Sequence, residues 1–114
     1  MITGDKHISS VREVPPSYLT VAGRPVATEC IGTSISSGGQ RDPEEYVPQP
    51  WNPQIKWEDL YRHGYVRVEA TPDVWRSDFR MIDHVDREEN ILVWTETNWE
   101  VLPDTPGATE VTAV

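Results

Sequence analysis

The sequence contains a single cysteine, Cys30, and this scarcity excludes two classes of site. One thiol cannot form an internal disulfide, and it cannot anchor a zinc site built on several cysteines. Nothing in the sequence therefore requires an oxidising compartment. Cys30 stands among β-branched residues, and we expect it to be a small, buried strand residue.

Basic residues are also scarce. The chain has 10 Lys and Arg against 19 Asp and Glu, which gives a formal net charge of −9. This excess of negative charge opposes binding to nucleic acid and to anionic membranes, because both carry charge of the same sign. A divalent cation is a better electrostatic partner for the chain.

Long apolar runs are absent. No stretch approaches the roughly 20 apolar residues of a membrane-spanning helix, and no basic and then apolar leader precedes the first residues that favour a strand. As written, the sequence has no export signal, and its compartment stays open.

Long helices have little room, because 10 prolines and 7 glycines interrupt the 114 residues. The expected fold is mainly β, with antiparallel strands and hairpins, long irregular loops and few helices. Alternation in GYVRVEA (64–70) and in residues 75–81 predicts a hairpin with a turn at 71–73. Further strands are expected at 25–35 and 91–101, where β-branched and apolar residues recur.

Three other segments lack a clear strand pattern. Residues 40–53 (QRDPEEYVPQPWNP) contain four prolines and predict a surface loop. Residues 54–61 fit both a helical turn and a strand. Residues 103–114 are small and polar and predict a flexible tail after a domain that covers 1–102.

The opening residues, MITGDKH, place two metal-ligand side chains on one loop. Three residues that favour a strand lead into Gly4, which lets the backbone bend sharply before Asp5 and His7. A carboxylate and an imidazole two residues apart can both bind a divalent or ferric ion. Asp5 and His7 are therefore the candidate metal ligands, although a motif this short also occurs by chance in surface turns.

Other polar residues offer weaker candidates. For His63, at the start of a strand, and for His84, in a turn, an exposed structural role outweighs a metal or phosphate role. The run TSISSGG (33–39) has hydroxyls and backbone N–H groups that can cradle an anion. It lacks the lysine and the following helix of a phosphate loop, so a polar strand end is favoured. A solvated strand face is likewise favoured over phosphate binding for the hairpin arginines, Arg67, Arg76 and Arg80.

Three blocks of the sequence resemble one family in their order and spacing. They are ITGDKH, RPVATECIGTSISSGG and NPQIKWEDLYRHGYVRVEATPDVWRSDFRMID. Together they are similar to the C-terminal part of the PhoD-like alkaline phosphatases, from Ile2 to about Val85. The resemblance implies a β-sandwich flanked by helices, as part of a secreted α/β metallophosphatase. It also implies hydrolysis of phosphate monoesters or diesters at alkaline pH, with iron and calcium as cofactors.

The resemblance places most of the family's metal ligands upstream of this sequence. Only the GDxH loop matches, with His7 as the stronger candidate ligand and Asp5 as either a ligand or a residue that orients His7. A hydrolytic metal site needs several ligands, so we expect the chain alone to bind metal weakly and to hydrolyse phosphate esters poorly or not at all. Its expected partners are a phosphate ester substrate and an N-terminal half on another chain.

A second interpretation stays open. The chain can instead be a non-catalytic, all-β binding or structural module that has kept the sheet and lost the chemistry. If the chain is a fragment, unpaired strand edges and exposed tryptophans among Trp51, Trp57 and Trp94 favour self-association, which the negative charge counters in part. No nucleic-acid partner is expected.

Overall fold

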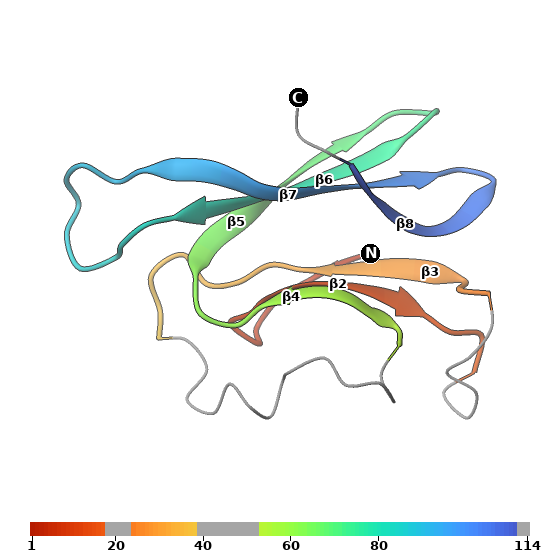
Figure 1. Cartoon of the computed structure of the whole chain (residues 1–114), viewed down its shortest axis with the longest axis horizontal. Helices are drawn as coiled ribbons and strands as arrows, with labels where there is room; N and C mark the ends of the chain where they lie inside the picture. The colour runs from red at the N-terminus through yellow and green to blue at the C-terminus, as the bar shows by residue number, and fades with distance from the viewer. Residues whose placement is uncertain (18–23, 39–52, 112–114) are drawn as a thin grey trace.

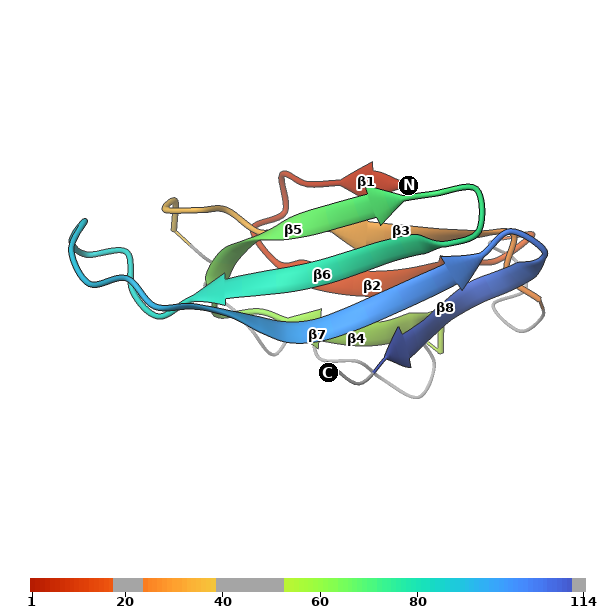
Figure 2. The ribbon, with the colours of Figure 1, turned by 90° about the horizontal axis from the view of Figure 1, so that it is seen from above.

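The chain folds into two four-stranded β-sheets that pack face to face. The computed structural model describes residues 1–17, 24–38 and 53–111. All elements among these residues are strands, which confirms the prediction of a mainly β fold with few helices. The described part of the chain accordingly has no helix that could cross a membrane. Figures 1 and 2 show the second sheet stacked over the first.

The first sheet contains the N-terminal half of the described chain. Its strands are β1 (Ile2–Thr3), β2 (Ser9–Val14), β3 (Ala27–Ile31) and β4 (Ile55–Asp59). They lie in the order β1-β3-β2-β4, with β1 parallel to β3 and the other pairs antiparallel. Cys30 in β3 is buried, as expected, and this burial raises the pKa of its thiol, so it is an inert core residue.

The second sheet is a meander of four antiparallel strands in sequence order. Its strands are β5 (His63–Ala70), β6 (Trp75–Ile82), β7 (Val93–Leu102) and β8 (Thr105–Val111). The pair β5–β6 confirms the predicted hairpin. In its turn, the Thr71 hydroxyl accepts hydrogen bonds from the backbone N–H groups of Asp73 and Val74, at 3.2 and 3.1 Å. Thr71 thus stabilises the turn that the sequence predicts at residues 71–73.

The predicted flexible tail is wrong for residues 105–111, which form β8 and pair with β7. Leu102 lies opposite Thr105, so the chain reverses over Pro103 and Asp104 in a tight turn. Strand β8 is an edge strand whose residues are exposed or half-buried, and its sequence therefore looks like that of a solvated tail.

Two further predictions change in detail. The strand expected at 25–35 covers only Ala27–Ile31, because the chain leaves the sheet at Gly32. The ambiguous segment 54–61 contains strand β4, and its pairing with β2 resolves what periodicity could not. The predicted surface loop at 40–53 lies, apart from Pro53, outside the described residues.

The main core fills the space between the two sheets. Phe79 from β6 is completely buried, and its ring meets Trp57 edge-on with ring centroids 4.9 Å apart. Trp57 and Trp94 are half-buried against this core, so neither is a free member of an exposed patch, while Trp51 lies outside the described residues. The buried members of the core are Val11, Cys30, Phe79, Met81 and Trp99.

Two carboxylates, Asp83 after β6 and Glu96 within β7, accept hydrogen bonds in the second sheet and its connections. The Asp83 side chain accepts a hydrogen bond from the backbone N–H of Leu92 at 2.9 Å, and this bond lowers the pKa of Asp83. Glu96 accepts hydrogen bonds from the Trp94 indole at 2.7 Å and from Arg62 at 2.6 Å, and both lower its pKa. Each carboxylate therefore stabilises the folded state while it is ionised.

We predict an acid-dependent loss of the Glu96 contribution. Because the folded pKa of Glu96 lies below its ordinary value of 4.5, its contribution is complete above that value and is lost as the pH falls through the folded pKa. In urea unfolding, wild type should exceed Glu96→Gln in stability at pH 7, and the difference should shrink towards pH 3. A difference that stays constant over this range would contradict the prediction.

Candidate functional site

The topology brings the predicted ligand loop and two other connections to one end of the sandwich. Strands β1 and β3 are parallel and end there, antiparallel β2 begins there, and β4 ends there before β5 begins. The loops 4–8, 32–38 and 60–62 therefore lie at the same end, as Figures 1 and 2 show. Segments distant in sequence can contact one another at this end.

The GDKH loop has an uncommon backbone. Asp5 and His7 adopt φ angles of 72° and 57°, in the left-handed region, which costs a non-glycine residue roughly 1–2 kcal/mol each. The turn is fixed by Ile8, which follows His7, is completely buried and packs with Ile31 and Leu60. A strained turn held by a packed anchor is a feature of functional loops.

The His7 ring has a defined tautomer. Its Nδ1 lies 2.6 Å from the carbonyl oxygen of Gly38, and a carbonyl can only accept a hydrogen bond, so Nδ1 carries the proton. In the neutral ring, Nε2 then has the free lone pair. Histidines that bind metals typically donate their other N–H to a carbonyl or carboxylate in this way. Gly38, rather than Asp5, contacts the His7 ring in the described structure.

A second histidine holds the neighbouring carbonyl. Nε2 of His63 lies 2.7 Å from the carbonyl oxygen of Ser37, which also accepts a 2.8 Å hydrogen bond from the Ser34 hydroxyl. The Ser34 carbonyl in turn accepts a 3.3 Å hydrogen bond from the backbone N–H of Gly64. The loop Ser34 to Gly38 thus presents carbonyls to imidazoles, which is opposite to the polarity that binding an anion at TSISSGG would need.

The sequence did not single out His63 as part of this site. The contact depends on where β4 ends and β5 begins relative to β3, and no local pattern contains that information. The available signal was His63 standing next to Gly64 at a strand start, which the sequence analysis weighed as an exposed structural role.

The donor set of the loop fits one part of a metal site. Asp5 and His7 are suitable ligands, and the free lone pair on Nε2 of His7 suits a metal ion. Among the described residues, however, no cluster of three or more His, Cys, Asp or Glu side chains could hold a metal ion. A complete site would need ligands from outside the described part of the chain.

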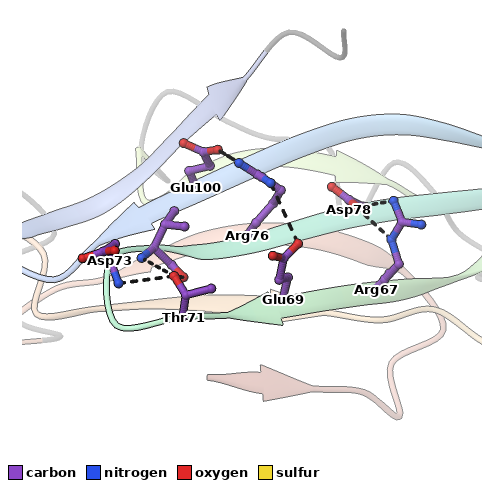
Figure 3. Close-up of polar contacts among 8 residues, drawn as sticks. Arg67, Glu69, Thr71, Asp73, Arg76, Asp78 and Glu100 are labelled. Atoms are coloured by element: carbon purple, nitrogen blue, oxygen red, sulfur yellow. Dashed lines mark hydrogen bonds and ion pairs between the residues drawn. The ribbon is translucent and has the colours of Figure 1, made fainter.

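The hairpin arginines pair with acidic groups on the outer face of the second sheet. Arg67 donates two hydrogen bonds to Asp78, at 2.9 and 2.6 Å, and Arg76 donates two to Glu100, at 3.0 and 2.7 Å (Figure 3). Arg80 donates to the Thr95 hydroxyl. The acidic partners compensate the charges of Arg67 and Arg76, which supports a solvated strand face over a phosphate site for these two residues. Thr95 is neutral and does not compensate the charge of Arg80.

The remaining histidine, His84, makes its contacts within the β6–β7 connection. Nε2 of His84 lies 3.0 Å from the carbonyl oxygen of Glu89, and its Nδ1 lies 3.0 Å from the Asp83 carboxylate. His84 therefore has a local structural role, as expected. A cavity of about 570 Å³ lies at the opposite end of the sandwich, between β3 and the β7–β8 turn, away from Asp5 and His7.

Comparisons with known proteins point to one family. The family model described as PhoD-like phosphatase matches residues 1–79 of the 114-residue chain. Alkaline phosphatase D of Bacillus subtilis (strain 168) is 29% identical over 118 residues, a match that spans 99% of this chain and 20% of that protein. A solved structure described as "Structure of PhoD" matches with a TM-score of 0.81 and 27% identity, over 99% of this chain and 22% of that one. The chain thus spans about a fifth of the length of the proteins it matches.

Proposed function

Because this chain belongs to the PhoD-like phosphatase family, we propose that it contributes one metal-ligand loop, and the sheets that support it, to a metal-dependent phosphate ester hydrolase. The observation that carries the proposal is the hydrogen bond from Nδ1 of His7 to Gly38, because it leaves Nε2 free to bind a metal ion. The strained turn at Asp5 and His7, fixed by buried Ile8, supports the same assignment.

Within this proposal, Nε2 of His7 and the Asp5 carboxylate are the groups that would hold a metal ion. A bound metal ion can activate water and stabilise charge on a phosphate oxygen. Iron and calcium are the ions that the family resemblance implies. An imidazole suits iron, and a carboxylate suits both ions.

The remaining ligands would come from a further part of the protein or from another chain. Two ligand side chains on one loop hold a metal ion weakly, so the described part of the chain alone should have low metal affinity. A phosphate ester and a chain segment that supplies upstream ligands are the proposed partners.

The metal assignment can be tested on the chain itself with Mn²⁺, a paramagnetic ion that broadens nearby NMR signals. We expect sub-stoichiometric Mn²⁺ to broaden the signals of Asp5 and His7 more strongly than those of the acidic loop 86–89. His7→Ala should remove the preferential broadening at residues 4–8. Equal broadening of both loops in wild type would contradict the assignment, since a chain with net charge −9 also attracts Mn²⁺ nonspecifically.

Hydrolysis of a chromogenic phosphate monoester and diester tests the activity. With iron and calcium supplied at alkaline pH, we expect the chain alone to show no turnover. Mixed with the remainder of the Bacillus subtilis alkaline phosphatase D, it should show metal-dependent turnover that His7→Ala reduces by at least about 10–100-fold. His84→Ala, which removes a histidine with local contacts only, is the matched control.

One observation favours a second candidate, a non-catalytic all-β module. It is the lack of a third ligand near Asp5 and His7 among the described residues. If the chain is a non-catalytic module, Mn²⁺ should broaden the signals of both loops equally, and no mixture should show turnover. The phosphatase proposal predicts local broadening, so the Mn²⁺ titration separates the two.

A further inference from the structure

We propose that His63 is a positioning residue that fixes the orientation and tautomer of His7 through the Ser37–Gly38 segment. The inference rests on the proposed function in one respect: it matters for chemistry only if His7 binds a metal ion. Its structural part, the coupling of two imidazoles through adjacent carbonyls, stands on the geometry alone.

The two histidines hold consecutive carbonyl groups. His63 donates from Nε2 to Ser37 at 2.7 Å, and His7 donates from Nδ1 to Gly38 at 2.6 Å. The planar peptide unit that contains the Ser37 carbonyl ends at Cα of Gly38, so fixing this carbonyl also fixes the Cα atom from which the Gly38 carbonyl extends. Only the φ and ψ angles of Gly38 then set the direction of that carbonyl. His63 therefore limits where the Gly38 carbonyl can meet His7.

The two ends of this arrangement differ in rigidity. His63 is the first residue of β5 and lies opposite Ile82 in β6, so its backbone belongs to a paired strand. The adjacent Gly64 is buried and donates its N–H to Ser34 at 3.3 Å, which ties the loop to the same strand. His7, by contrast, lies in a turn. Orientation is thus transmitted from the sheet, through the loop, to the candidate ligand.

Removing the His63 donor should release the Ser37 carbonyl, although the Ser34 hydroxyl still donates to it at 2.8 Å. With the loop less restricted, the Gly38 carbonyl should no longer favour the proton on Nδ1 of His7. A neutral imidazole in water prefers the proton on Nε2, so the ring should revert to that tautomer. That change would place a proton on the nitrogen that is proposed to bind a metal ion.

The test uses long-range ¹H–¹⁵N correlations of the imidazoles in the full 114-residue chain, without metal, at about pH 8, well above the reference imidazole pKa of about 6.5 for model peptides. In wild type, His7 should be protonated on Nδ1 and His63 on Nε2. In His63→Phe, which keeps a ring and removes the donor, the Nε2-protonated tautomer of His7 should become the major form. His63→Gln, whose amide can donate to Ser37, should restore most of the wild-type pattern.

His84→Phe is the matched control, because His84 also bonds to a backbone carbonyl, but in another loop. It should leave the His7 tautomer unchanged. A His7 ring that stays protonated on Nδ1 in a folded His63→Phe chain would overturn the proposal. If His63→Phe does not fold, the tautomer of His63 in the wild-type chain is the test. His63 protonated on Nδ1 instead of Nε2 would also overturn the proposal, because Nε2 could then not donate to Ser37.

The tautomer experiment tests the role of His63, and the Mn²⁺ titration tests metal binding at His7, so either proposal can be refuted without the other. Uniform Mn²⁺ broadening together with the expected tautomer shift would refute metal binding at His7 and leave the coupling between the histidines intact. Local Mn²⁺ broadening together with an unchanged tautomer in His63→Phe would support the metal site and refute the role of His63.

Discussion

Replacing Phe79 by alanine is expected to lower the free energy of unfolding by about 4 kcal/mol, the middle of the range for a buried aromatic side chain. Phe79 is completely buried between the two sheets, and Trp57 packs edge-on against its ring at 4.9 Å. The cavity left by the ring would lie in the core that fills the space between the two sheets. For a domain with roughly 5–15 kcal/mol of total stability, such a loss is severe.

Thermal unfolding measures this effect directly. A loss of about 4 kcal/mol should lower the midpoint by roughly 15 °C for a chain of this size. Val26→Ala, which shortens a side chain that is 66% exposed, is the control and should shift the midpoint by less than about 2 °C. A Phe79→Ala midpoint close to that of the control would show that the two sheets do not pack around this ring.

The sequence predicted those parts of the fold in which local pattern and burial agree. In β6, Ser77, Phe79 and Met81 are buried and alternate with polar residues, and a turn precedes the strand, so the hairpin could be predicted. Strand β8 could not, because an edge strand with exposed residues has the composition of a tail. Residues 54–61 fit both a strand and a helical turn, and only the pairing of β4 with β2 distinguishes the two.

The candidate site divides in the same way. Asp5 and His7 could be found because both ligand types stand in one short motif. The hydrogen bonds of His7 to Gly38 and of His63 to Ser37 join residues that are 31 and 26 positions apart in sequence. Such contacts depend on the order of strands in the sheets, which no single segment specifies.

Gly64→Ala is the second substitution with a large expected effect. A Cβ atom at Gly64 would lie 2.0 Å from the carbonyl oxygen of Arg80 and 3.1 Å from Cα of Met81. Both are backbone atoms of the paired strand β6, so the clash cannot be relieved by rotating a side chain. Strand β5 would have to move away from β6 where Gly64 lies opposite Met81. We expect a loss of about 3 kcal/mol, at the upper end for overpacking.

The same substitution should also disturb the candidate site, because Gly64 follows His63 and donates its N–H to Ser34. Gly38→Ala is the matched control, since a Cβ atom at Gly38 would have no atom of the described residues within 4 Å apart from its chain neighbours. Urea unfolding should therefore show a large shift for Gly64→Ala and almost none for Gly38→Ala, although both glycines belong to the same hydrogen-bonded loop system. Equal shifts would mean that β5 does not approach β6 as closely as the structure shows. Suppose that Gly64→Ala both lowers the urea midpoint strongly and abolishes the Nδ1-protonated tautomer of His7. That result would link the stability of the β5–β6 pair to the geometry of the candidate ligand.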